Sequence, residues 1–173
     1  MALGKFTYQF CIMEDVMKEF IGVFVNPKNK DIGGMLTAQT PFQALYHSLM
    51  SLYRYHITEK ALVDEFETLL SKMHGLNETR NDLIHAIWDV GVTSTSIKRR
   101  KMTATFSKGL RVDVETYTVD EINELTDQLI ECTERLLMFS YDWQVRHPEN
   151  FKDFKEFMSL FPKDYKPLMV KKP

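Results

Sequence analysis

Apolar residues recur at intervals of three and four along most of this chain, and such spacing is typical of helices that bury one face. The first pattern of this kind predicts a helix over residues 6–25, with charged residues opposite its phenylalanines and methionines. The helix should end before Pro27, because the residue that precedes a proline is disfavoured in the helical conformation. Residues 28–34 contain two consecutive glycines and are predicted to form a polar loop.

Two more helical patterns follow in the first half of the chain. One is predicted to begin at Thr40, whose hydroxyl suits the capping position, with Pro41 in the first turn, and to run to about Ile57. The next covers residues 58–90 and contains Gly75 near its middle. Periodicity alone leaves open whether this stretch forms one long helix or two shorter ones.

The segment that follows changes to an alternating pattern. It is rich in threonine, serine and valine, has Gly109 near its middle, and alternates charged residues with valine over residues 111–115. Alternation of this kind is typical of a strand with one buried face. We therefore expect a small β-hairpin-like insertion over residues 92–117.

The last long helix has the clearest start. Thr118 and Glu121 have the spacing of a capping box, in which the hydroxyl and the carboxylate each bind a free backbone N–H of the first turn. Apolar residues then keep helical spacing until just before Pro148. Residues 149–173 are predicted to form a short aromatic helix and a loose basic tail.

Together these patterns predict one all-α domain over residues 1–173, in which residues 5–146 form a four-helix up-and-down bundle. The length of 173 residues and the hydrophobic fraction of 44% suit one globular domain. The net charge of −2 argues against a protein that coats nucleic acid through a wholly basic surface, although a local basic patch remains possible.

The cysteines and the apolar runs bear on the compartment. Cys11 and Cys132 lie far apart without a metal-binding or redox spacing around either, so we expect free thiols in a reducing environment. The longest apolar run covers residues 20–25, far short of the roughly 20 residues that cross a bilayer. We therefore expect a cytoplasmic protein without a membrane partner.

Candidate chemistry is concentrated at the end of the third helical pattern. Asn81 and His85 lie four positions apart, so they share a helical face, which Trp88 continues. Arg80 lies about 140° around the helix from His85, and only its long side chain would bring the guanidinium to the same site. An imidazole that exchanges protons near neutral pH, an amide and a fixed cation together suit a phosphate centre.

A purely structural interpretation of the same residues is also open. In it, Arg80 pairs with a neighbouring carboxylate such as Glu78 or Asp82. His85 and Trp88 then merely pack on a face of the bundle, as most isolated helical histidines do.

The string RNDLIHAIW at residues 80–88 resembles the R-N-x-x-x-H motif of the HEPN superfamily, whose members often carry R-N-x-x-x-H-x-x-W at the end of the third helix. The order of elements is also similar to that of HEPN proteins from bacterial defence and toxin–antitoxin systems. The resemblance implies a four-helix bundle that dimerises with its two motif helices facing each other. Many such proteins are endoribonucleases that need neither a metal nor another cofactor.

Carried over to this chain, the resemblance implies a role for each motif residue. His85 would be the acid or base that acts on the ribose 2′-OH or on the leaving 5′-oxygen. Arg80 would stabilise the charged phosphorane-like state, and Asn81 would position one of these groups. Because in-line attack needs a base on one side and an acid on the other, and one motif supplies one histidine, we expect a composite site in a homodimer.

The resemblance also bears on partners and regulation. RNA is the expected substrate, and an antitoxin or another defence-system protein is a possible partner. HEPN toxins that are silenced through modification of a tyrosine carry that tyrosine two positions after the histidine, where this chain has Ile87. That form of regulation is therefore not expected. The alternative function is a non-catalytic helical module for dimerisation and for binding RNA or a protein.

A cationic segment follows the motif directly and is interleaved with Phe106. Its placement in the expected hairpin suggests that it guides an RNA backbone toward the motif. The simpler alternative is a solvated loop. The cationic candidates are Lys98, Arg99, Arg100, Lys101, Lys108 and Arg111.

Overall fold

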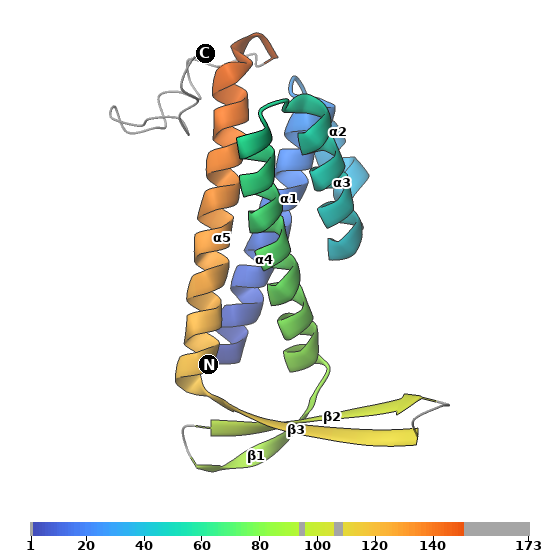
Figure 1. Cartoon of the computed structure of the whole chain (residues 1–173), viewed down its shortest axis with the longest axis vertical. Coiled ribbons are helices and arrows are strands. Elements are labelled where there is room, and N and C mark those ends of the chain that lie inside the picture. The colour runs from blue at the N-terminus through green and yellow to red at the C-terminus, as the bar shows by residue number, and fades with distance from the viewer. Residues whose placement is uncertain (1, 94–95, 106–108, 151–173) are drawn as a thin grey trace.

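The computed structural model describes residues 2–93, 96–105 and 109–150, which form a helical bundle with a small antiparallel sheet at one end (Figure 1). The helices are α1 (Ala2–Val25), α2 (Lys30–Thr37), α3 (Phe42–His56), α4 (Lys60–Ile84) and α5 (Val119–Arg146). The strands are β1 (Ile87–Thr93), β2 (Ser96–Thr105) and β3 (Gly109–Thr118), and a 3-10 turn, η1 (Pro148–Asn150), follows α5.

Helix α1 is the centre of the bundle and buries ten residues, most of them aromatic or aliphatic. At its C-terminal end, the ring of Phe24 lies 5.1 Å from that of His56 in α3 and 5.0 Å from that of Trp143 in α5. Since all three residues lie near the C-terminal ends of their helices, α1, α3 and α5 run in the same direction. Helix α4 runs the opposite way, because Glu59 at its start contacts Arg146 at the end of α5 at 2.9 Å.

These helix directions differ from the strict alternation of the four-helix up-and-down bundle expected from the sequence, because α1 and α3 run the same way. The difference comes from α2, which occupies residues expected to form a loop and carries the chain back before α3 begins. Asn29 caps α2 by accepting a hydrogen bond from the Asp31 backbone N–H at 3.1 Å. Gly33 allows close packing on α1, since a Cβ there would lie 2.2 Å from the Gly22 Cα. Gly33 therefore permits this helix crossing, and the two consecutive glycines do not break α2.

The start of α3 also differs from expectation. Helix α3 begins at Phe42, with Pro41 as the N-cap and no capping bond from a side chain. The hydroxyl of Thr40, expected to cap α3, donates instead to the Leu36 carbonyl at 3.3 Å, at the end of α2. Thr40 therefore completes the preceding helix.

Helix α4 resolves the open question at Gly75, because it runs without interruption from Lys60 to Ile84. It stops six residues before the expected end at Val90, and the residues beyond it pair with β2. The three strands form a sheet in the order β1-β2-β3, with antiparallel neighbours. The hairpin-like insertion is confirmed. It has one strand more than a hairpin, because β1 precedes β2 and β3 and starts earlier than expected, at Ile87.

Helix α5 follows the sequence prediction closely. Its capping box is present: the Thr118 Oγ1 accepts from the Glu121 backbone N–H at 3.2 Å, and the Glu121 carboxylate accepts from the Thr118 backbone N–H at 2.7 Å. The short aromatic helix expected near the C-terminus falls on residues 151–173, which lie outside the described residues.

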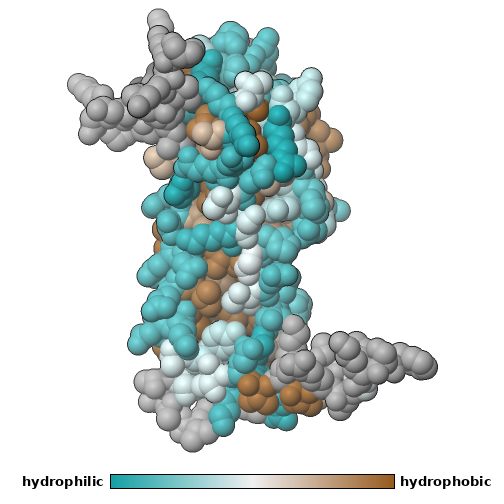
Figure 2. All heavy atoms as spheres, viewed as in Figure 1, coloured by the Kyte–Doolittle hydropathy of each residue, from teal (hydrophilic) through white to brown (hydrophobic). Residues whose placement is uncertain are grey.

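Hydrophilic residues cover most of the face seen in Figure 2, with hydrophobic residues showing between the long helices and at the sheet. None of the described helices combines the length and apolar character needed to cross a membrane. Both cysteines are free thiols; Cys11 is exposed and Cys132 is buried.

Candidate functional site

The three motif residues lie together at the C-terminal end of α4, next to the sheet. Arg80 and Asn81 belong to the last turns of the helix, and His85 is the residue at which the helix ends. The backbone N–H of His85 still donates to the Asn81 carbonyl at 3.0 Å, so the two residues keep the one-turn spacing expected from the sequence.

Arg80 is partly buried between α4 and α1. Its Nη1 donates to the Asn81 Oδ1 at 3.0 Å, and its guanidinium carbon lies 5.2 Å from the centre of the Phe10 ring. The Nε is buried and has no hydrogen-bond partner among the described residues. Burial raises the pKa of nearby Glu14, while the positive charges of Arg80 and then Lys18 act to lower it. The structure thus places Arg80 against α1, with Asn81 and not Glu78 or Asp82 as its hydrogen-bond partner.

His85 is the most accessible member of the motif. The residue is exposed, and no hydrogen bond or ion pair of its ring is found within the described part of the chain. Its imidazole can therefore meet a substrate in solution, as general acid–base catalysis requires. A histidine packed on a bundle face, as the structural interpretation expected, is not what the structure has.

Trp88 lies on β1 and not on the helical face that Asn81 and His85 were expected to share with it. Its indole Nε1 donates to the Leu83 carbonyl in the last turn of α4 at 3.0 Å. The ring also packs against the hydrophobic core. Pairing of β1 with β2 and this inward fold of Trp88 explain why the helix stops at Ile84.

The cationic segment is divided between the two faces of the sheet, because successive strand residues point to opposite sides. Paired across the strands, Ile87, Arg100 and Val114 form a row on the face turned away from the helices. Ile87 and Val114 are exposed there, and Arg100 is partly buried. Lys98 is exposed on the same face, so this surface offers a cation to solvent near the end of α4.

Arg99 lies on the opposite face and is only 3% exposed. Its guanidinium forms ion pairs with Asp82 of α4 at 3.0 Å and with Glu115 of β3 at 2.8 Å, and lies 5.9 Å from the centre of the Tyr117 ring. This placement does not fit the expected contact with an RNA backbone. The side chains of Lys101, Lys108 and Arg111, also expected to contact RNA, lie outside the described part of the structure.

Sequence reasoning missed two charged neighbours of the motif. Glu14 interrupts the apolar spacing of α1 four residues after Phe10, which was a signal that a charged group approaches the core at that level. Asp82 was considered only as a partner of Arg80. The sequence analysis took the cationic segment as one surface. In a strand Arg99 and Lys98 point to opposite faces, and without the register nothing indicates which of them faces the helices.

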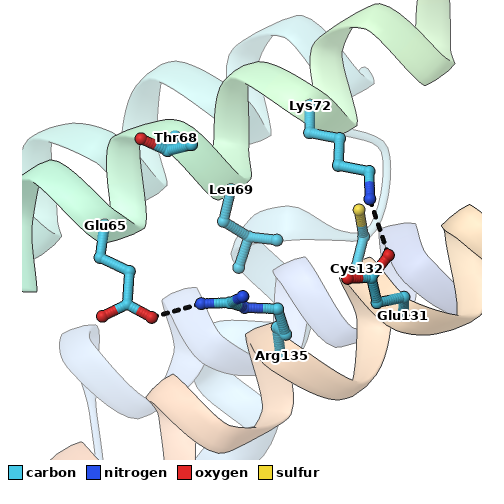
Figure 3. A pocket seen from close by; sticks show the side chains of 7 residues that line it. All are labelled: Glu65, Thr68, Leu69, Lys72, Glu131, Cys132 and Arg135. Carbon is cyan, nitrogen blue, oxygen red and sulfur yellow. Dashed lines mark hydrogen bonds and ion pairs between the residues drawn. The ribbon is translucent and has the colours of Figure 1, made fainter.

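A separate cavity of about 210 Å³ lies between α4 and α5 (Figure 3). Two ion pairs, Glu65 with Arg135 and Lys72 with Glu131, bridge the helices beside it. Burial raises the pKa of the Cys132 thiol, so a reactive thiolate is disfavoured there. Cys132 is therefore not an activated nucleophile in this cavity. Its lining residues are Glu65, Thr68, Leu69, Lys72, Glu131, Cys132 and Arg135.

Comparison of the chain with protein-family models, curated proteins and solved structures finds no match. Among the residues that the structure describes, no group of three histidine, cysteine, aspartate or glutamate side chains is placed to hold a metal ion. The interpretation of the site therefore rests on its own geometry and on the motif.

Proposed function

We propose that this protein is a HEPN-type endoribonuclease that cleaves single-stranded RNA without a metal ion. The observation that carries the proposal is the exposed imidazole of His85 at the end of α4, one turn after Asn81, which is hydrogen-bonded to Arg80. This places a proton-exchanging group, an amide and a cation at one end of the bundle. Along the chain, Arg80, Asn81 and His85 follow the order and spacing of the R-N-x-x-x-H motif.

In the proposed reaction, the ribose 2′-OH attacks the adjacent phosphorus while its proton passes to a base, and the bond to the 5′-oxygen breaks as that oxygen gains a proton. The products carry a 2′,3′-cyclic phosphate and a 5′-OH. His85 performs one of these proton transfers, and His85 of a second copy performs the other. Arg80 stabilises the negative charge that develops on the phosphoryl oxygens.

The exposed outer face of the sheet supports binding of the RNA backbone near this end of α4. Lys98 presents its charge to solvent there and can neutralise a phosphate. Arg99 has no part in this contact, because its guanidinium is buried between two carboxylates.

A second candidate function, a non-catalytic module that binds RNA or a protein, is favoured by the position of Arg80. Its guanidinium lies over Phe10 and donates a hydrogen bond to Asn81, and its Nε is buried, where a phosphate in solution does not reach it. An arginine held in this way stabilises the end of α4 and does not need a substrate to explain its presence.

Cleavage of a labelled single-stranded RNA in EDTA tests the proposal. We expect wild-type protein to release ends with 2′,3′-cyclic phosphate, and His85→Ala to be at least ~100-fold slower, the usual contribution of a general acid or base. His47→Ala is the matched control, because His47 is also exposed but lies on α3. Equal rates in wild type and His85→Ala would contradict the proposed site. RNA binding without cleavage by folded wild-type protein would favour the second candidate.

A further inference from the structure

Helices α3 and α4 run antiparallel, and their outer faces bring two histidines together. Near the end of α3, Arg54 pairs with Glu67 of α4 at 2.7 Å. Near the start of α3, Gln43 bonds to His74, which lies seven residues beyond Glu67 on α4. His47 follows Gln43 by one turn, on the same face of α3. His47 and His74 are therefore neighbours across the helix pair.

The side-chain amide of Gln43 connects the two imidazole rings. Its Nε2 lies 2.9 Å from the Nε2 of His47, and its Oε1 lies 3.2 Å from the Nε2 of His74. Because the amide N–H donates to His47, the Nε2 of that ring carries no hydrogen and presents its lone pair. The amide oxygen accepts the hydrogen that the Nε2 of His74 carries. The tips of both rings thus point at the same small group.

The surroundings of the two rings suit a bound cation. The Tyr46 ring lies 5.1 Å from the His47 ring and 5.4 Å from the His74 ring, and Tyr46 packs against the hydrophobic core. His47 is exposed and His74 is partly exposed, so solutes reach both. Glu78 is exposed one turn after His74 on the same face of α4, and its negative charge attracts a cation.

We propose that His47 and His74 bind a transition-metal ion of the zinc class, which replaces the Gln43 amide between the two rings. Imidazole suits Zn²⁺, Cu²⁺ and Ni²⁺, whereas Mg²⁺ and Ca²⁺ prefer oxygen ligands. A tetrahedral ion with Zn–N bonds of about 2.0–2.1 Å holds two nitrogens about 3.3 Å apart, and rotation of these accessible side chains brings them to that spacing. The hydrogen on the Nε2 of His74 passes through water to its Nδ1, so both Nε2 atoms give lone pairs to the ion. Water completes the coordination.

The bound ion joins the first half of α3 to the second half of α4. It lies near the start of α3, which has no capping bond from a side chain. His74 precedes His85 by eleven residues, or about 16 Å along the helix at 1.5 Å per residue. The ion therefore lies away from the motif, and the inference is independent of the proposed ribonuclease function.

Isothermal titration calorimetry of untagged, metal-free protein with Zn²⁺ tests the site. A Cys11→Ser background removes the exposed thiol, which is a competing zinc ligand. We expect His47→Ala and His74→Ala each to bind Zn²⁺ at least ~10-fold more weakly, since even the loss of a residue that supports a metal ligand costs about 10- to 100-fold. Mg²⁺ should not bind.

His147→Ala is the matched control, because His147 is also partly exposed but lies at the end of α5. Its affinity for Zn²⁺ should equal that of the Cys11→Ser protein. A Cys11→Ser protein that binds no Zn²⁺ would overturn the proposal. An equal loss of affinity in His147→Ala and His74→Ala would overturn it as well.

Gln43→Glu tests the geometry through a gain of affinity. The new carboxylate completes a ligand set of two histidines and one glutamate, which zinc sites in proteins use, so we expect at least ~10-fold tighter binding. Zn²⁺ should also raise the urea midpoint of Gln43→Glu more than that of wild type. Gln128→Glu, which adds the same charge on the exposed face of α5, should bind Zn²⁺ as wild type does. Equal affinities in the two variants would show that the rings do not converge at residue 43; neither measurement involves RNA.

Discussion

At the scale of single residues, the surroundings of Arg80 set the electrostatics of the motif. Its guanidinium sits between the Phe10 ring, the amide of Asn81 and the charge of Glu14. Although Arg80 attracts the Glu14 carboxylate, burial is the larger influence and raises the pKa of that carboxyl above 4.5. The charged form of Glu14 is therefore less favourable in the folded protein than in the unfolded chain.

This shift gives a pH prediction for Glu14→Gln. Below pH 4.5 the carboxyl is protonated in both states, and its charge costs the fold nothing. As pH rises through the raised pKa, the folded state loses stability relative to the unfolded chain, because the carboxyl must ionise while partly buried. Glutamine has no such titration. We therefore expect the stability gain of Glu14→Gln over wild type to increase from pH 4 to pH 7 in urea unfolding.

The control for this experiment is Glu19→Gln, which removes an exposed carboxylate from the same helix. Its difference from wild type should change less with pH than that of Glu14→Gln. If the two variants follow the same pH profile, the pH dependence does not come from burial of Glu14.

At the scale of helices and strands, two glycines in helices have opposite environments. A Cβ at Gly75 in α4 would meet nothing within 4 Å, whereas a Cβ at Gly33 in α2 would lie 2.2 Å from the backbone of Gly22. We expect Gly75→Ala to raise the free energy of unfolding by about 0.5–1 kcal/mol, because alanine loses less backbone entropy in a helix. Gly33→Ala should lower it by about 1–3 kcal/mol, because the crossing of α1 and α2 must open.

Urea denaturation midpoints at one pH measure both changes, and each glycine serves as the control for the other. A loss of stability in Gly75→Ala would mean that α4 needs flexibility at this position. A neutral Gly33→Ala would mean that the two helices do not approach as closely as the structure shows.

These elements also show how far the sequence alone determines the fold. The apolar spacing over residues 6–25 and the capping box at Thr118 predicted α1 and α5 closely, because both signals are local. The helix at residues 30–37 was missed, since glycine disfavours a helix locally and only the approach to Gly22 makes it useful. The end of α4 at Ile84 was misplaced for the same reason: pairing with β2 overrides the helical periodicity of the segment that follows.

The same distinction between local signals and contacts of distant segments applies to the candidate site. The one-turn spacing of Asn81 and His85 was predictable, because it depends on one helix. The burial of Arg99 was not, because it depends on the register of three strands and on where the sheet meets α4. A cationic run that reads as one surface in the sequence is therefore divided by the sheet, with Lys98 facing solvent and Arg99 facing the helices.

At the scale of the whole molecule, the sheet and the bundle are joined at Arg99. Its two ion pairs connect β2 to Asp82 on α4 and to Glu115 on β3, and it lies near the Tyr117 ring. Asp82 is one residue from Asn81 and three from His85, so the contact also holds the end of the helix that carries the motif. Trp88 adds a second link through its bond to Leu83.

The last prediction concerns this connection. Arg99→Met keeps an unbranched side chain but removes the guanidinium, so Asp82 and Glu115 lose the cation that they share. Both carboxylates remain partly exposed and can be hydrated, so we expect a loss of about 1–2 kcal/mol, less than for a fully buried pair. Hydrogen exchange should become faster in the sheet and in the last turn of α4, and remain slow in α1. Arg135→Met, which removes an exposed pair with Glu65, should change stability by less than about 1 kcal/mol. Equal losses in the two variants, or faster exchange throughout the bundle, would show that Arg99 does not specifically join the sheet to the helices.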